Sequence, residues 1–193
     1  MTAQILFACT GNICRSPFAE RLAAHLVTGL PPAHPAGGWQ FASAGIGALV
    51  GWPVDPGMAA ELAARGGSAE GFVARQLTAT MARGADLILT LESTHRDHIL
   101  DEWPALVRRT LVLGKAARVV AELGAPGDDT LAALRAHRGA PDRADDIMDP
   151  YRRGEAAARE AAQQIERALE SLLGGAGPRS WRVSEPRVTG CGA

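Results

Sequence analysis

Short apolar runs alternate with segments of helical periodicity along most of this chain, and this alternation constrains the fold more than any other feature. Four runs have the length of buried strands: residues 5–8, 41–44, 86–91 and 110–113. Helices are expected between and after these runs: one from Ser16, and others over 55–65, 93–103 and 155–173. Strands joined by helices form a parallel sheet that is covered on both faces. The chain is therefore predicted to be an α/β protein, a three-layer sandwich of helices, sheet and helices.

The first helix has the clearest local signals. Ser16 is a favourable N-cap residue, and Pro17 suits the first helical position. Phe18, Leu22 and Leu26 repeat every four residues, which gives the helix one apolar face. The chain thus begins with a strand, a loop and a helix.

The pattern loosens between residues 115 and 146, where two short helices are predicted over 116–123 and 130–138. We expect this stretch to be an insertion that packs on the edge of the sheet. Beyond residue 173, glycine and proline break the last helix and no periodicity follows, so residues 175–193 are expected to form a flexible tail. With 193 residues and 47% hydrophobic content, the rest of the chain suits one domain over residues 1–174.

The bulk charge and the cysteine content exclude several classes of protein. Twenty Lys and Arg residues stand against 21 Asp and Glu residues, so the net charge of -1 gives no reason to bind nucleic acid or an anionic membrane. The N-terminal apolar run is too short for a signal peptide or a membrane span, and a cytoplasmic location without membrane insertion is expected. Cys9, Cys14 and Cys191 are too few for a disulfide framework, and the histidines do not pair with them as zinc ligands do.

Cys9 and Arg15 are separated by five residues in a loop between a buried strand and a helix N-terminus. Backbone amides in such a loop can surround a phosphate, and Gly11 and Asn12 are the residues best suited to left-handed backbone angles there. Arg15 carries a planar fork of donors that matches two phosphoryl oxygens. The Ser16 hydroxyl is placed to hydrogen-bond the Cys9 sulfur. These surroundings favour the thiolate form of Cys9, which is a nucleophile.

A lone cysteine at the end of a strand is more often a small buried apolar residue than a nucleophile. Only its combination with Arg15, Gly11 and Asn12 in this context favours a catalytic role for Cys9.

Expelling an alkoxide or a phenolate from a phosphate ester requires a proton donor. Asp149 is the best candidate, because Pro150 keeps it out of helical geometry and Tyr151 offers an aromatic wall for a flat substrate ring. An ordinary helix start before Glu155 is the alternative interpretation of the same residues. In the catalytic interpretation Cys9 attacks phosphorus and Asp149 protonates the leaving oxygen. Asp149 then activates water to hydrolyse the phosphocysteine, and neither a metal nor a cofactor is required.

The segment from Phe7 to Glu20, FACTGNICRSPFAE, resembles the signature of low-molecular-weight protein tyrosine phosphatases. Asp149-Pro150-Tyr151 resembles the general-acid loop of the same family. Residues 43–51, 74–77 and 86–90 are similar to those of bacterial members associated with exopolysaccharide production.

The resemblance covers about residues 4–114 and 147–172, and it implies a four-stranded parallel sheet in the order 2-1-3-4 and hydrolysis of phosphotyrosine. It also implies a substrate-recognition loop around Leu49 to Trp52. Further substrate contacts are implied for Thr10, Gly11, Asn12, Ile13, Cys14, Ser16 and Tyr151. The implied partner is a tyrosine-phosphorylated protein, such as a bacterial tyrosine kinase, and the chain is expected to be a monomer or a weak dimer.

In this family the residue at Cys14 traps the oxidised nucleophile in a reversible disulfide, although Cys14 taken alone is more simply a packing residue. Two other functions remain open. Arsenate reductases of the same fold share the cysteine loop, but they need further downstream cysteines, and only Cys191 is available. A phosphotyrosine-binding regulator without turnover would need neither a nucleophile nor an acid. His95 and His98 could chelate a metal, but an exposed polar helix face is the simpler interpretation.

Overall fold

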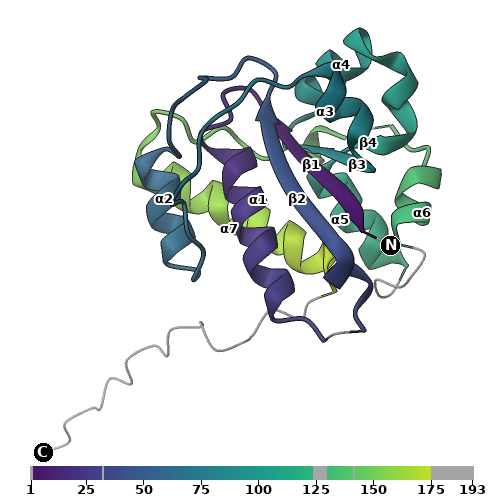
Figure 1. The fold of residues 1–193 in the computed structure, drawn as a ribbon, viewed down its shortest axis with the longest axis horizontal. Helices are drawn as coiled ribbons and strands as arrows, with labels where there is room; N and C mark the ends of the chain where they lie inside the picture. Colours follow the sequence, from purple (N-terminus) through teal and green to yellow (C-terminus); the bar gives the residue numbers. More distant parts are fainter. Residues whose placement is uncertain (1, 32, 124–129, 141, 175–193) are drawn as a thin grey trace, which may run out of the picture.

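The computed structural model describes residues 2–31, 33–123, 130–140 and 142–174 of the chain. Four strands form one parallel sheet: β1 (Ala3–Cys9), β2 (Trp39–Gly45), β3 (Leu87–Thr90) and β4 (Thr110–Val112). The order across the sheet is β2-β1-β3-β4, which confirms the predicted order (Figure 1). β1 and β3 are central, and every side chain of β3 is buried, as expected for an apolar strand with a neighbour on each side.

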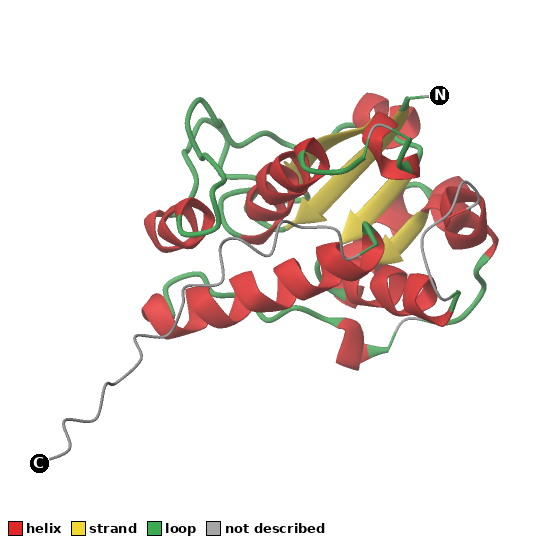
Figure 2. Cartoon of the chain, turned by 90° about the horizontal axis from the view of Figure 1, so that it is seen from below, coloured by secondary structure: helices red, strands yellow, loops and turns green. Residues whose placement is uncertain are grey.

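Helices cover both faces of the sheet. One face carries α1 (Arg15–Thr28), α5 (Leu113–Glu122) and α7 (Gly154–Leu172), with α2 (Pro56–Ala63) packed against α1 and α7. The other face carries α3 (Ala79–Gly84), α4 (Ser93–Glu102) and the 3-10 helix η2 (Pro104–Arg109). The remaining short helices are η1 (Pro35–Gly38), α6 (Thr130–Ala136) and η3 (Arg143–Asp145). Figure 2 shows the strands enclosed by helices, which is the predicted three-layer sandwich.

Alternate residues of β1 belong to two separate hydrophobic clusters. Ile5 and Phe7 pack with α1, α5 and α7, whereas Leu6 and Ala8 pack with α3 and α4. Successive side chains of a strand point to opposite faces of a sheet. Cys9, the last residue of β1, therefore faces the α1 side, where the following loop begins.

The helix boundaries confirm part of the prediction and correct part of it. Phe18, Leu22 and Leu26 are buried as predicted, but α1 begins at Arg15, with Cys14 at the N-cap and no side-chain cap. The prediction that Ser16 caps this helix is therefore wrong. The helix α3 was not predicted, because six residues that follow a Thr78 cap are too few to show a helical repeat.

The helix α5 corrects the interpretation of residues 115–146 as an insertion on the edge of the sheet. Its buried residues Ala116, Ala117, Val119 and Val120 belong to the main hydrophobic cluster, and the helix packs along α7. At least this part of the stretch is thus built into the helical layer. Residues 175–193, predicted to be a tail, lie outside the described residues.

Within the described residues, no helix combines the length and the apolar character that crossing a lipid bilayer would require.

Candidate active site

Hydrogen bonds from neighbouring segments to its carbonyl groups hold the loop that follows β1 in place. Four carbonyl oxygens accept hydrogen bonds of 2.7 to 3.0 Å from the backbone amides of residues 46, 47, 49 and 55. In the same order, the accepting carbonyls belong to Cys9, Thr10, Gly11 and Ile13. In a planar trans peptide the next N–H points the opposite way, and the described residues contain no cis peptide bond. The amides of Thr10, Gly11, Asn12 and Cys14 therefore face the inside of the loop, where they can bind an anion.

Asn12 fixes the shape of this loop. It is fully buried and has a left-handed backbone with φ of 55°, as predicted. Its side-chain nitrogen donates to Ser16 Oγ (3.0 Å) and Ser43 Oγ (2.9 Å), and its side-chain oxygen accepts from the Arg75 amide (2.9 Å). Gly11, by contrast, is not among the residues with positive φ, so the expectation of left-handed angles there is wrong.

The close approach of the loop to the end of β2 explains why a glycine, Gly45, stands at that position. A Cβ atom on Gly45 would lie 2.4 Å from the carbonyl oxygen of Thr10. Real Cβ atoms do not come that close to backbone, so only glycine at the end of β2 lets the loop pack there.

Cys9 lies at the base of a cavity of about 190 Å³. Its side chain is almost wholly buried, and Sγ lies 2.9 Å from Ser16 Oγ, as the sequence predicted. The residues that line the cavity are Cys9, Thr10, Gly11, Ile13, Cys14, Arg15, Gly47, Leu49, Asp149 and Tyr151.

Arg15 is only 2% exposed, and its guanidinium joins the loop to two other segments. Nη1 donates to the Ile147 carbonyl oxygen (2.9 Å) and to the Glu92 carboxylate, and Nη2 lies 3.3 Å from Asp149 Oδ1. Nε is buried and has no partner among the described residues. A buried donor without a partner is costly, and a phosphoryl oxygen in the cavity would satisfy it.

Asp149 lies at the mouth of the cavity with its side chain 48% exposed. Its Oδ1 accepts a hydrogen bond of 3.2 Å from the Tyr151 amide. The helix α7 begins only at Gly154 and its N-cap is Arg153, so Asp149 does not cap it. The alternative of an ordinary helix start at Asp149 is therefore wrong.

The segment before Asp149 is attached to the end of β3. The amide and hydroxyl of Ser93 donate to Asp146 Oδ1 (2.6 Å) and Oδ2 (2.8 Å), and the Ile147 amide donates to the Leu91 carbonyl (2.8 Å). These bonds bring residues far apart in the sequence to the same edge of the sheet as Cys9.

Two residues that the sequence analysis did not assign to this site, Glu92 and His95, lie behind Arg15. Burial alone would raise the pKa of Glu92, but the Arg15 guanidinium and His95 hold it below its usual value. His95 is 2% exposed, which overturns its interpretation as part of an exposed polar face. Its Nε2 lies 2.9 Å from Thr10 Oγ1, and burial together with Arg15 lowers its pKa to about 4.

One sequence signal could have found Glu92. It lies two residues after the end of β3, the neighbour of β1, and polar residues at the carboxyl ends of adjacent parallel strands converge on one site.

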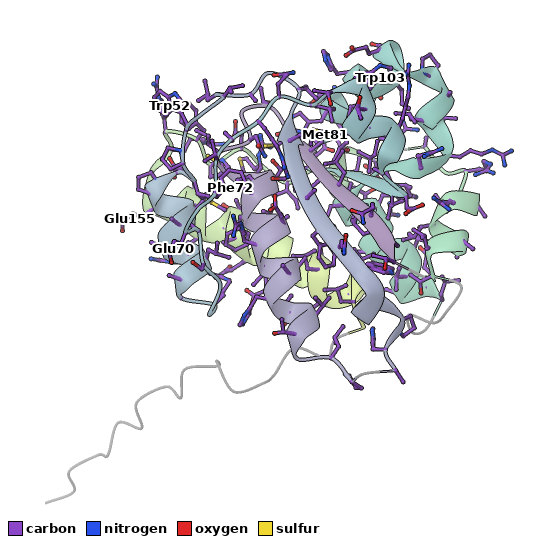
Figure 3. All side chains as sticks on the ribbon, in the orientation of Figure 1. Trp52, Glu70, Phe72, Met81, Trp103 and Glu155 are labelled. Carbon is purple, nitrogen blue, oxygen red and sulfur yellow. The ribbon has the colours of Figure 1, made fainter. Side chains whose placement is uncertain are left out.

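The other predicted site residues divide into three groups. Thr10, Gly11, Ile13, Cys14, Leu49 and Tyr151 line the cavity. Asn12 and Ser16 are buried behind the loop and support it. Trp52 is 56% exposed, is not part of the lining and points away from the body of the molecule (Figure 3). Among the described residues, no group of three or more His, Cys, Asp or Glu side chains is arranged to hold a metal ion.

Cys14 shares the cavity with Cys9, and both thiols are free. Burial, with Asp55, Cys9 and Asp149, raises the pKa of Cys14 far above its usual value, against the opposing effect of Arg15. Cys14 is thus a neutral thiol at neutral pH.

Comparison with known proteins agrees with this geometry. The sequence model of the family "Low molecular weight phosphotyrosine protein phosphatase" matches residues 4–180. The chain belongs to this family. The low molecular weight protein-tyrosine-phosphatase Wzb of Salmonella typhi is 41% identical over 114 residues, 59% of this chain and 70% of the relative.

Solved structures of the phosphatase family superpose on most of the chain. The tyrosine phosphatase AmsI of Erwinia amylovora has a TM-score of 0.67 and 28% identity, and the match covers 93% of this chain and 95% of AmsI. The YwlE arginine phosphatase of Geobacillus stearothermophilus has a TM-score of 0.67 and 26% identity over 89% of this chain and 90% of YwlE. This chain is thus a phosphatase with the fold of its family, and its relatives include tyrosine and arginine phosphatases.

Proposed function

We propose that this phosphatase hydrolyses phosphotyrosine in proteins through a phosphocysteine intermediate, with Cys9 as nucleophile, Arg15 as phosphate clamp and Asp149 as general acid. The observation that carries the proposal is that these three side chains line one cavity, inside a loop whose amides face inward. Each of the three has a chemical task there that simple packing would not require.

The first step forms a bond between Cys9 Sγ and phosphorus while the bond from phosphorus to the phenolic oxygen breaks. The Asp149 carboxyl group transfers its proton to that oxygen, so the leaving group departs as neutral phenol. Arg15 and the loop amides stabilise the charge on the equatorial oxygens. In the second step ionised Asp149 takes a proton from water, the water oxygen bonds to phosphorus, and the Cys9 thiolate is released with inorganic phosphate.

The walls of the cavity favour a flat apolar ring. Ile13, Leu49 and Tyr151 line it, and Asp149 is the one carboxylate among the lining residues that the structure describes. A phenyl ring gains from apolar contact, whereas the guanidinium of phosphoarginine needs several acceptors. We infer a preference for phosphotyrosine over phosphoarginine, in spite of the likeness to YwlE.

The substrate that we propose is a tyrosine-phosphorylated cytoplasmic protein, such as a bacterial tyrosine kinase. The names of the curated relatives, bacterial protein-tyrosine-phosphatases, support this choice. Three large apolar side chains that are exposed in the segments beside the loop offer contact area for a protein: Val50, Trp52 and Val73.

A substrate panel tests the proposal. Wild-type protein, without added metal, should hydrolyse a phosphotyrosine peptide at least about tenfold faster than the matched phosphoserine or phosphoarginine peptide. Arsenate should not be reduced. Faster phosphoarginine hydrolysis would reassign the substrate, and thiol-dependent arsenate reduction would favour the reductase alternative.

Replacement Asp149→Asn tests the acid. The variant should slow release of a poor leaving group, such as phenol, by about a hundredfold or more, and should slow release of p-nitrophenol much less. Equal slowing of both esters would mean that another group supplies the proton.

A further inference from the structure

A second cleft, separate from the cysteine loop, lies at the β4 edge of the sheet. It is a hollow of about 140 Å³, comparable to the 190 Å³ cavity above Cys9. Since β3 lies between β1 and β4, the two sites are at least two strand spacings apart, about 10 Å. The walls come from α4, η2, β4, the first turn of α5 and the residues that follow α6.

Basic side chains dominate this cleft. Among the ten described residues that line it, none is a carboxylate and five are cationic or histidine: Arg96, Arg108, Lys115, His137 and Arg138. The chain as a whole has a net charge of only -1, so the positive charge is local to this part of the surface. A neighbouring hollow lined by Arg108, Arg109, Arg135 and Arg138 extends the positive surface. A concave surface of one sign raises the local concentration of counter-ions.

Some of these cations are already engaged, and others are not. Arg96 Nε donates to the Thr110 carbonyl (3.2 Å), and Arg138 Nη1 donates to the carbonyls of Arg135 (2.9 Å) and His137 (3.0 Å). Arg108 and Lys115 have no ion pair with any carboxylate in the described part of the chain. With respect to the described residues, these two side chains are thus available to a ligand.

His137 adds an unsatisfied polar atom to the same wall. Its Nε2 is buried and has no hydrogen-bond partner within the described residues. A Cβ atom on Gly139 would lie 2.5 Å from this Nε2 and 3.1 Å from Lys115 Nζ, so both groups lie close to residue 139 and to one another. Burial and Lys115 lower the pKa of His137, so at neutral pH its ring is neutral and can donate one hydrogen bond.

We propose that this cleft is a second oxyanion site, which binds a phosphoryl group through Arg108, Lys115 and His137. Two guanidinium or ammonium groups and one ring N–H suit a compact dianion with several acceptor oxygens. The phosphoryl group can belong to free phosphate, the product of the proposed reaction, or to a second phosphorylated residue of the protein substrate. This choice of ligand rests on the proposed function, whereas the presence of an oxyanion site does not.

The test is a titration of ¹⁵N-labelled protein followed by two-dimensional NMR, in which each site reports separately. Inorganic phosphate should shift amide signals of residues 107–115 and 137–139 with a dissociation constant of their own, besides those of residues 9–16. In the double variant Arg108→Gln/Lys115→Gln, the dissociation constant obtained from residues 107–115 and 137–139, the β4-edge signals, should rise about tenfold or more. The dissociation constant obtained from residues 9–16, the loop signals, should not change.

The matched control is Arg167→Gln, which removes an exposed cation from α7, on another part of the surface. It should leave both constants unchanged. Sodium chloride at equal ionic strength should not reproduce the shifts. The proposal is overturned if sodium chloride does reproduce them, or if phosphate does not shift the β4-edge signals of the wild type. It is also overturned if phosphate shifts these signals equally in the wild type and the double variant.

A phosphoserine peptide and its unphosphorylated counterpart distinguish the two sources of the phosphoryl group. The phosphopeptide and inorganic phosphate should both shift the β4-edge signals, and the unphosphorylated peptide should not. Tighter binding of the phosphopeptide than of inorganic phosphate identifies a protein-bound group, and binding no tighter than that of inorganic phosphate identifies the free product. Hydrolysis of p-nitrophenyl phosphate is measured in parallel and should stay within about twofold of wild type in the double variant. Loss of activity in the wild type itself would count against the proposed function without affecting the NMR result.

Discussion

Asn12 is the residue whose conformation the cysteine loop depends on most directly. A left-handed backbone is unfavourable for a residue with a Cβ atom by about 1–2 kcal/mol, and glycine escapes this cost. Replacement Asn12→Ala should therefore destabilise the protein by about 1 kcal/mol more than Asn12→Gly, since both lose the same side-chain hydrogen bonds. Urea unfolding of the two variants measures the difference. Equal stabilities would show that the φ of 55° does not constrain the loop.

At the scale of residues, sequence reasoning brought together the right side chains where one local motif contains them, since Cys9 and Arg15 line one cavity. Cys9 ends β1 and Arg15 begins α1, on the two sides of one short loop, so the local motif predicted a common site. Glu92 and His95 were not assigned to the site, because their roles come from contacts with Arg15 and Thr10, across strands that are distant in sequence. His95 shows the limit clearly, since a polar helix sequence does not reveal which of its faces is buried.

At the scale of elements, α5 makes a prediction that separates a core helix from an edge insertion. Val120 is 1% exposed, and Leu123, just beyond the helix, is 54% exposed. Val120→Ala should lower the free energy of unfolding by about 2 kcal/mol, because it leaves a cavity between α5 and its neighbours. Leu123→Ala should change it by no more than about 0.5 kcal/mol. Chemical denaturation measures both, and a Val120→Ala effect as small as that of the control would contradict the core role of α5.

Elements with strong local signals were predictable and the others were not. The long apolar face of α7 and the Asp55 cap of α2 placed those helices to within about two residues. For α5 the sequence predicted a helix, but its place in the structure depends on α7, which follows about thirty residues later and covers it. The position of a short helix within a layer is a tertiary property that periodicity does not encode.

At the scale of the whole molecule, stability should depend on pH through His95, which is buried, and Glu92, which is partly buried, behind Arg15. The folded pKa of His95 is about 4, below its ordinary 6.5, so between these values the unfolded chain binds the proton and the folded chain does not. Stability is therefore lost as the pH falls from about 6.5 to about 4. The lowered pKa of Glu92 acts in the same direction at lower pH, because its stabilisation is lost as the pH falls through its folded pKa.

The variant His95→Asn keeps a hydrogen-bonding group beside Thr10 and does not titrate. From pH 7 to pH 5 the wild type should lose about 2 kcal/mol more of its unfolding free energy than this variant. Urea unfolding at the two pH values gives the comparison. Parallel losses in both proteins would show that His95 is not the group responsible.

The whole fold was predictable as a class from the alternation of strands and helices. The order β2-β1-β3-β4 was not derivable from periodicity and came from the family resemblance. Nothing in a local pattern specifies which strand lies beside which, because that choice depends on how the connecting helices divide between the two faces.

The central claim is that the Cys9 sulfur carries the phosphoryl group between the two steps. Asp149→Asn protein mixed with p-nitrophenyl phosphate and quenched in acid should retain this intermediate, because the group that activates water is missing. Intact-mass and fragment analysis should find one added phosphoryl group, on Cys9 and not on Cys14. Turnover without a phosphorylated Cys9, or a phosphoryl group on any other residue, would contradict the account.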